Sequence, residues 1–136
     1  MAESRIFPAN LDYLNDVLAF LEGFLKGRGA SVKVTYALIV SLEELFVNVA
    51  SYAYEGPGGE AEISLDFDEK MRTLIIVLKD SGIPFDPLAK EDPDITLSAE
   101  ERSIGGLGIF MVKQTMDSIA YQRENDQNIV RMTKQI

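Results

Sequence analysis

The sequence predicts an α+β fold, a two-layer sandwich of about three helices on one mixed, mostly antiparallel sheet. Three observations predict it. Two segments with helical apolar spacing come first, two strand-like segments follow, and a glycine-led helix with two short strands ends the sequence. A chain of 136 residues is long enough to bury one core, so we expect a single domain over residues 1–136.

The two N-terminal helices are predicted from spacing and from their end signals. A short strand at Arg5–Pro8 is expected to come first. Asn10 is a suitable N-cap for a helix over Leu11–Lys26, and glycines follow it. A second helix is expected from about Lys33 to about Tyr54, because a glycine- and proline-rich turn comes next.

The strands are predicted from alternation and from apolar content. Residues 61–67 alternate apolar and polar side chains, as a half-buried strand does. The nearly continuous apolar run 73–78 is typical of a central strand. Two more strands are expected at Ser118–Arg123 and Ile129–Thr133, joined by a polar turn over residues 124–128.

Residues 83–102 interrupt this pattern. They contain three of the five prolines and six acidic residues against two basic ones, with no apolar period. Such a long irregular segment inside a compact domain is typical of a lid or of disorder, and we expect a lid at about 83–104. Order is expected to resume with a helix that begins at the glycines 105–108 and ends near Asp117.

Composition excludes several functions. The chain has no His and no Cys, which removes imidazole bases, thiolate nucleophiles and zinc–thiolate sites. A net charge of −9 disfavours nucleic acid and anionic membrane surfaces as partners. The N-terminal residues do not read as a signal peptide, and the apolar runs look too short to cross a membrane, so a cytoplasmic protein is expected.

The second helix carries the first candidate site. At about 100° per residue, Leu38, Leu42 and Leu45 share a core face, while Glu44 and Asn48 lie on a polar stripe beside it. Glu43 points away from that stripe, towards water. The stripe is either a solvated helix face or a place for a hard cation and a general base.

Two glycine-containing segments carry the other candidates. Asp80, at the end of the apolar strand, could accept a hydrogen bond from an exocyclic amine, with Gly82 leaving bare backbone for a flat ring; an ordinary Asp-Ser-Gly turn is the alternative. The run Gly105, Gly106, Leu107 and Gly108 at a helix start suits phosphate oxygens, or else forms a lid hinge. Arg102 is the candidate cation for a terminal phosphate.

With these motifs in this order, the sequence resembles the GHKL ATP-binding superfamily and, within it, the bacterial anti-sigma-factor serine kinases that act by partner switching. Glu44 and Asn48 match the family's N-box pattern, Asp80 to Gly82 match its Asp-x-Gly box, and residues 105–108, continued by Ile109, match its second glycine box. Tyr52 stands where the family often has a His. The fold that this resemblance implies is the Bergerat ATP-binding fold.

The resemblance also implies site roles and partners. Glu44 would be the general base towards a serine hydroxyl, Asn48 would coordinate Mg²⁺, and Asp80 would read the adenine of ATP. The implied partners are an anti-anti-sigma-type antagonist protein, which would be phosphorylated, a sigma factor, and a second copy of the chain bound through the N-terminal strand and sheet.

Other functions remain open at this stage. The alternative to a kinase is a non-catalytic, nucleotide-responsive module that sequesters a partner protein. A sensor histidine kinase catalytic domain fits less well, because the chain has no His acceptor and no room for a dimerisation helix pair.

Overall fold

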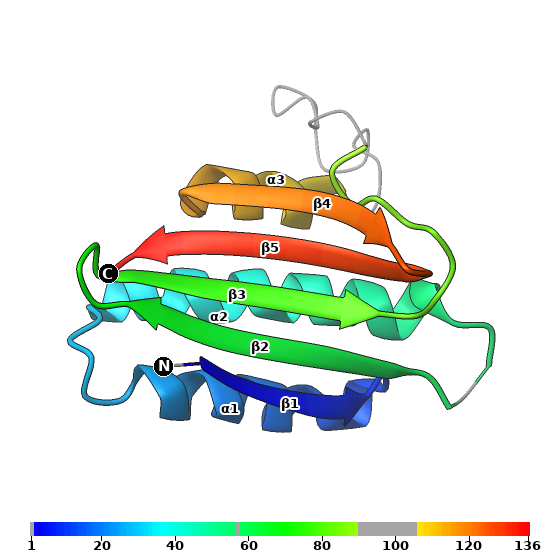
Figure 1. Ribbon diagram of the computed structural model, residues 1–136, viewed down its shortest axis with the longest axis horizontal. Coiled ribbons are helices and arrows are strands. Elements are labelled where there is room, and N and C mark those ends of the chain that lie inside the picture. Colours follow the sequence, from blue (N-terminus) through cyan, green and yellow to red (C-terminus); the bar gives the residue numbers. More distant parts are fainter. Residues whose placement is uncertain (1, 57, 90–105) are drawn as a thin grey trace.

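A computed structural model describes residues 2–56, 58–89 and 106–136 of the chain. Helices cover one face of a five-stranded sheet (Figure 1). The helices and strands, in chain order, are β1 Ala2–Pro8, a 3₁₀ turn Leu11–Tyr13, α1 Leu14–Leu25, α2 Val32–Asn48, a π-helical turn Val49–Ala53, β2 Glu60–Asp68, β3 Thr73–Asp80, α3 Gly106–Thr115, β4 Ser118–Glu124 and β5 Gln127–Gln135.

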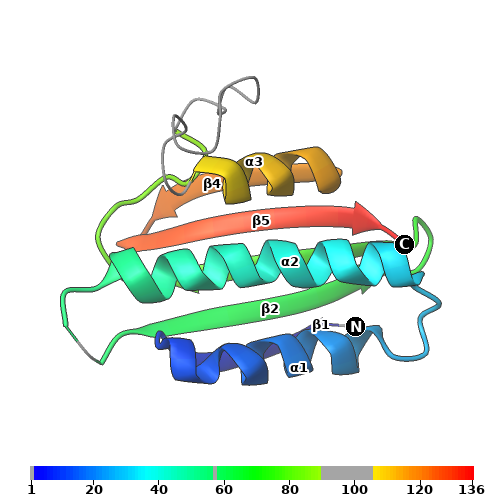
Figure 2. The ribbon, with the colours of Figure 1, turned by 180° about the vertical axis from the view of Figure 1, so that it is seen from behind.

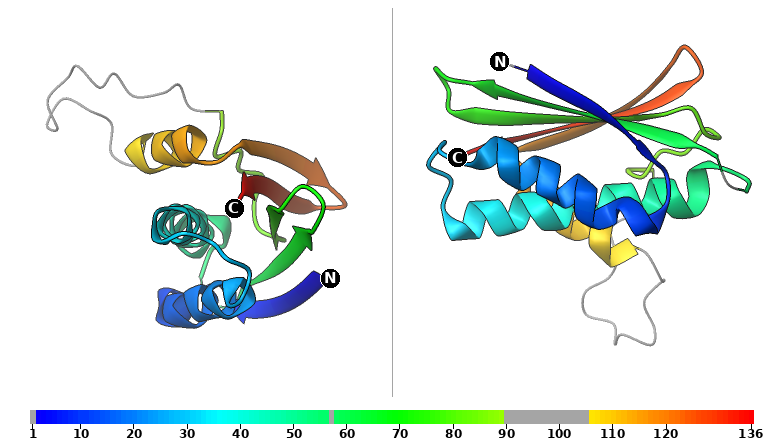
Figure 3. Two further views of the ribbon diagram at one scale, coloured as in Figure 1. Left: turned by 90° about the vertical axis from the view of Figure 1, so that its left-hand side faces the viewer. Right: turned by 90° about the horizontal axis from the view of Figure 1, so that it is seen from below.

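The sheet confirms the predicted α+β class. Its strand order is β1-β2-β3-β5-β4, and all four pairings between the described strands are antiparallel. β3 is central, as its apolar run predicts, but it is buried on one face only, through Leu74, Ile76, Leu78 and Asp80. The two edge-on views in Figure 3 show why, since α1, α2 and α3 all lie on the same side of the sheet.

The first helix begins where its cap predicts. The Asn10 side chain accepts a hydrogen bond from the Asp12 amide at 2.8 Å, which starts the 3₁₀ turn that leads into α1. After α1, Gly27 and Gly29 both adopt positive φ, so the chain turns back towards α2. Ser31 caps α2 in the same way, because its hydroxyl accepts from the Val34 amide at 3.1 Å.

Helix α2 is the centre of the helical layer. Leu38, Leu42 and Leu45 are buried on its sheet-facing side, as the apolar spacing predicts. By length and composition, Val32–Ala53 is apolar enough to cross a membrane, so the expectation that no apolar segment is long enough was wrong. In the fold this segment is the core helix, with its apolar face packed on the sheet (Figure 2).

The end of α2 differs from the prediction in its geometry. The last residues, Val49–Ala53, form a π-helical turn rather than continuing the α-helix to Tyr54. The wider turn rotates the residues after Asn48 relative to a regular helix, and π turns of this kind are frequent at functional sites. Tyr52 is consequently exposed, whereas Ala53 points into the core.

The β4–β5 hairpin is longer than predicted. Only Asn125 and Asp126 lie in the turn, both with positive φ, as a two-residue hairpin turn requires. Asn128, predicted to lie in the turn, is therefore a strand residue opposite Asp80 of β3. This register brings a C-terminal side chain to the end of the central strand.

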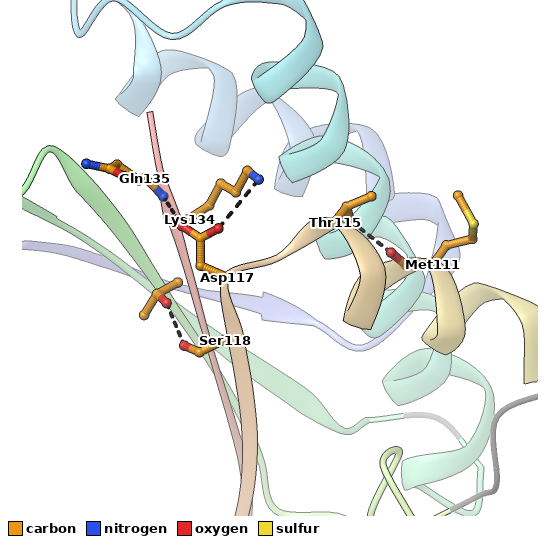
Figure 4. Close-up of polar contacts among 7 residues, drawn as sticks. Met111, Thr115, Asp117, Ser118, Lys134 and Gln135 are labelled. Carbon is orange, nitrogen blue, oxygen red and sulfur yellow. Dashed lines mark hydrogen bonds and ion pairs between the residues drawn. The ribbon is translucent and has the colours of Figure 1, made fainter.

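The C-terminal end of α3 is tied to β5 by polar contacts (Figure 4). Asp117 accepts a hydrogen bond from the Gln135 amide at 2.7 Å and lies 3.6 Å from the Lys134 ammonium group. The Ser118 and Thr133 hydroxyls are 2.5 Å apart across the strand pair. These contacts fix the end of α3 against the sheet and thereby hold its opposite end beside α2.

Candidate functional site

A pocket lies between the C-terminal end of α2 and the ends of β3 and β5. Its walls are mainly apolar, with three polar side chains among them. The lining residues are Leu45, Asn48, Val49, Ala53, Leu78, Asp80, Phe85, Pro87, Asn128 and Val130. An apolar cleft with a few polar groups that converge is the usual form of a small-molecule site.

Asp80 is the most buried carboxylate of this pocket. Its side chain is 6% exposed, and its Oδ1 accepts two hydrogen bonds at 2.9 Å, from the Gly82 amide and from the Asn128 amide group. Within the described part of the chain, no donor bonds its Oδ2. The structure therefore leaves one acceptor oxygen of Asp80 for a ligand that carries an N–H group.

Asn128 was missed by the sequence reasoning. It is 3% exposed and makes four hydrogen bonds: its Nδ2 donates to Asp80 and to the Ile83 carbonyl, and its Oδ1 accepts from the Tyr121 hydroxyl and the Phe85 amide. The Ile83 carbonyl can only accept a hydrogen bond and the Phe85 amide can only donate one, so these two partners fix the orientation of the Asn128 amide. The sequence offered one signal: Asn128 occupies a position in the alternation of β5 at which the next two residues are apolar and buried.

The loop after β3 packs directly against the end of α2. The Ile83 amide donates to the Ala53 carbonyl at 2.8 Å, and a side chain at Gly82 would collide with that same carbonyl. The Arg123 guanidinium also donates to the Gly82 carbonyl, at 2.9 Å. Gly82 was predicted to leave space for a flat ring. On the side that faces the helix, the contact between loop and helix is what requires glycine at this position.

The beginning of the predicted lid belongs to this packed region. The Phe85 backbone is bonded to Asn128, Pro87 is buried, and Leu88 packs against the core. Asp86 caps a turn by accepting from the Leu88 amide at 2.8 Å. Phe85 and Pro87, at the beginning of the predicted lid, thus line the pocket; residues 90–104 of that lid lie outside the described part.

Tyr54 and Tyr52 connect the π-helical turn to this wall. The Tyr54 hydroxyl donates to the Glu60 carbonyl at 2.5 Å and accepts from the Ser81 amide at 2.9 Å. Tyr52, at the position where the resembled family often has a His, is exposed and lies against Phe85, with ring centroids 6.1 Å apart. Tyr52 therefore contributes an aromatic surface at the edge of the pocket.

Glu44 lies on the α3 side of α2, one turn before Asn48. A side chain at Gly108 would overlap the Glu44 carboxylate, so the first turn of α3 can approach Glu44 only because residue 108 is glycine. Burial away from water, followed by the negative charge of Glu43, raises the pKa of the Glu44 carboxyl above its ordinary value of 4.5. No described residue forms an ion pair or hydrogen bond with this carboxylate.

The polar stripe of α2 is thus not a simple solvated face. Ser41 is 1% exposed, and Glu44 and Asn48 are half-buried. Glu43, predicted to face water, is also only half-exposed. Asn48 lines the pocket with Asp80, whereas Glu44 lies beside α3 and outside that lining.

The glycine-rich segment is described only in part. Gly106, Leu107 and Gly108 form the first turn of α3, as predicted, and Ile109 is buried in the core. Any contact of Ile109 with a ligand would therefore be through its backbone. Arg102 and Gly105, the other predicted phosphate-binding residues, lie outside the described residues.

Comparison with known proteins places this architecture among ATPases. The family described as "Histidine kinase-like ATPase domain" matches residues 7–134. The serine/threonine-protein kinase BtrW of Bordetella bronchiseptica is 26% identical, over 87% of this chain and 82% of its own length. The serine-protein kinase RsbW of Bacillus licheniformis is 28% identical, over 93% of this chain and 81% of its own length.

Solved structures share the fold. A Mycobacterium tuberculosis structure with RsbU and RsbW domains superposes with a TM-score of 0.69 at 12% identity, over 99% of this chain; the chain spans 32% of that longer protein. The histidine kinase domain of Erythrobacter litoralis EL346 superposes with a TM-score of 0.58 at 17% identity, over 94% of this chain and 61% of its own.

The network around Asn128 predicts a stability effect. We expect Asn128→Ala to lower the free energy of unfolding by about 2–4 kcal/mol, because it leaves buried partners of four hydrogen bonds unsatisfied. Tyr121→Phe, which removes one of them, should cost about 1 kcal/mol. Urea unfolding measures both, with Gln122→Ala, exposed on the same hairpin, as the control; equal values for Asn128→Ala and the control would contradict the network.

The environment of Glu44 predicts a pH-dependent effect. The folded protein holds the Glu44 proton more tightly than the unfolded chain does, so ionisation of Glu44 lowers the free energy of unfolding as pH rises through its pKa. Glu44→Gln should therefore be more stable than the wild type at pH 7, and the difference should shrink towards pH 4. Unfolding curves at both pH values measure it, and a constant difference would contradict the raised pKa.

Proposed function

The chain belongs to the histidine kinase-like ATPase domain family, and on this basis we propose that it is an ATP-dependent protein serine/threonine kinase of the anti-sigma-factor type. The observation that carries the proposal is the Asp80 carboxylate, whose Oδ1 is held by Gly82 and Asn128 while its Oδ2 remains unbonded by described residues in an apolar pocket. The similarity to BtrW and RsbW supports the choice of a serine or threonine acceptor.

In this proposal the adenine base lies in the pocket. Its exocyclic amine donates to Asp80 Oδ2, and Leu45, Leu78 and Val130 provide apolar surface for the ring. Guanine has a carbonyl oxygen at the corresponding position, which the carboxylate would repel. The site thereby selects ATP over GTP through one charged acceptor.

The phosphate end of ATP would lie towards α3. The first turn of α3 presents backbone amides and the positive end of the helix dipole, and both stabilise phosphate oxygens in a protein of net charge −9. Gly105, Gly106, Leu107, Gly108 and Ile109 are the proposed phosphate-binding backbone, with Arg102 as the cation.

The donor set near Asn48 fits Mg²⁺ held jointly by protein and phosphates. Among the described residues no group of three carboxylates or imidazoles could hold a metal ion alone. Mg²⁺ commonly takes only one or two protein oxygens and completes its shell with water and phosphate. Asn48 would supply its side-chain oxygen, and the bound ion would neutralise phosphate charge.

Glu44 is the proposed general base. The acceptor hydroxyl oxygen forms a bond to the γ-phosphorus, the bond from that phosphorus to the β–γ bridging oxygen breaks, and ADP leaves with the electron pair. The hydroxyl proton passes to Glu44. A carboxylate with a raised pKa and no competing partner among the described residues is suited to accept it.

The proposed acceptor is a serine or threonine of an anti-anti-sigma-type antagonist protein in the cytoplasm. A sigma factor would be the alternative partner, and a homodimer through β1 and the sheet is part of the same proposal. A non-catalytic nucleotide-responsive module is the competing function, since Asp80 and Asn48 would serve nucleotide binding in either case.

The adenine assignment predicts a loss of affinity. Asp80→Asn should weaken Mg·ATP binding about 10- to 100-fold, because it removes a charged acceptor worth about 1.5–3 kcal/mol. Isothermal titration calorimetry measures it, with Asp126→Asn as a control that makes the same charge change in an exposed turn. Equal affinities of Asp80→Asn and the wild type would refute the assignment.

The base assignment predicts a separation of binding from chemistry. Glu44→Gln should bind Mg·ATP within about threefold of the wild type and lose phosphate transfer by about 100-fold or more. The measurement is incorporation of labelled γ-phosphate into an antagonist protein from the same genome. If no phosphoprotein forms with the wild type, and Glu44→Gln regulates its partner normally, the non-catalytic module is the correct function.

A further inference from the structure

On the face that points away from the sheet, helix α2 carries apolar side chains together with the charged Lys33 and Glu43. Tyr36, Val40 and Val47 are spaced so that they lie opposite the buried Leu38, Leu42 and Leu45, and we name these three residues the outer stripe. A surface helix with one buried face ordinarily carries polar residues on the other.

The outer stripe is open in part: Tyr36 is exposed, whereas Val40 and Val47 are half-buried. Helices α1 and α3 pack along the two sides of α2 and leave its outward face open, as Figure 2 shows. Tyr36 is 69% exposed, and Val32, one turn before it, is 88% exposed. An open hollow of about 840 Å³ continues the surface towards α1, lined in part by Leu25, Thr35 and Ile39.

Glu44 borders the outer stripe. It is four residues after Val40 and three before Val47, so its carboxylate lies over the same turns of the helix. Gly108 of α3 adjoins it from the other side. A protein that brings a hydroxyl group to Glu44 from the outward side of α2 would place the surface around that hydroxyl over Val40 and Val47.

We infer that the outer stripe is the docking surface for the protein substrate, a partner that presents its acceptor hydroxyl among apolar side chains with a basic residue nearby. The inference rests on the proposed kinase function. Val40, Val47 and Tyr36 would contact the apolar side chains, and Glu43, half-exposed on the same face, would pair with the basic residue.

The charges of this face disfavour the other two occupants. An anionic membrane surface would be repelled by Glu43 and Glu44 and by the net charge of −9. A second copy of the chain, packed two-fold on the same stripe, would bring four carboxylates, Glu43 and Glu44 of each copy, together with two Lys33 side chains, which leaves an excess of negative charge at the contact. A protein surface that carries both apolar and basic side chains would pack on the outer stripe and pair with the carboxylates.

Tyr36→Ala tests the inference. The side chain is largely exposed, so stability should change by less than about 0.5 kcal/mol. With the antagonist protein as substrate and saturating Mg·ATP, KM for the antagonist should rise about tenfold or more, while kcat and the ATP affinity stay within about twofold. Tyr13→Ala, which removes an exposed tyrosine before α1, is the matched control and should leave KM unchanged.

A second measurement locates the contact. A photo-crosslinking amino acid at position 36 should attach to the antagonist, and one at exposed Gln122 on β4 should not. Unchanged KM for Tyr36→Ala with an active wild type overturns the docking inference alone. If the wild type phosphorylates no antagonist, the kinase proposal is overturned and the inference with it. If the chain dimerises through the outer stripe, or binds vesicles of anionic lipid, the docking inference is overturned in favour of that occupant.

Discussion

The burial of the Asp80 carboxylate is the constraint on which the rest of the site depends. A buried carboxylate is costly unless donors reach it. Here the donors are the Gly82 amide and the Asn128 side chain. The first requires a tight turn after β3, and the second requires β5 to run beside β3 with Asn128 opposite Asp80. The β3–β5 pairing and the turn after β3 therefore together provide the donors that this buried carboxylate needs.

Helix α2 meets three different surroundings along its length. Its sheet face supplies the core through residues such as Leu42, and its α3 side carries Glu44 and Asn48. Its outward face carries the outer stripe. Because all three faces belong to one rigid helix, the distance between the pocket and the proposed docking surface is set by helix geometry rather than by a loop. The π-helical turn changes the direction of the chain at the point where the loop after β3 packs against it.

Elements with a strong local signal could be predicted from the sequence, and long-range partners could not. The Asn10 cap and the apolar spacing of α2 depend on neighbours within a few residues, and both were confirmed. The placement of Asp80 at the end of a central strand was also confirmed. Asn128 was read as part of a turn, because three of its four hydrogen-bond partners are more than 40 residues away in the sequence. The contacts of Phe85 with Asn128 and of Leu88 with the core were not predicted for the same reason, since their partners are distant in the sequence.

The two carboxylates of the site have opposite environments, and this difference favours different chemical roles. Asp80 is supplied with donors and keeps one oxygen for a ligand, whereas Glu44 is packed against Gly108 and next to Glu43, with no partner among the described residues. In this chain without histidine, the proposed base is a carboxyl group whose pKa is raised by partial burial and by the neighbouring Glu43. Gly108 is what permits it: any larger residue would displace either α3 or the carboxylate. The glycine motif and the proposed base are thus one structural unit, although 64 residues separate them in the sequence.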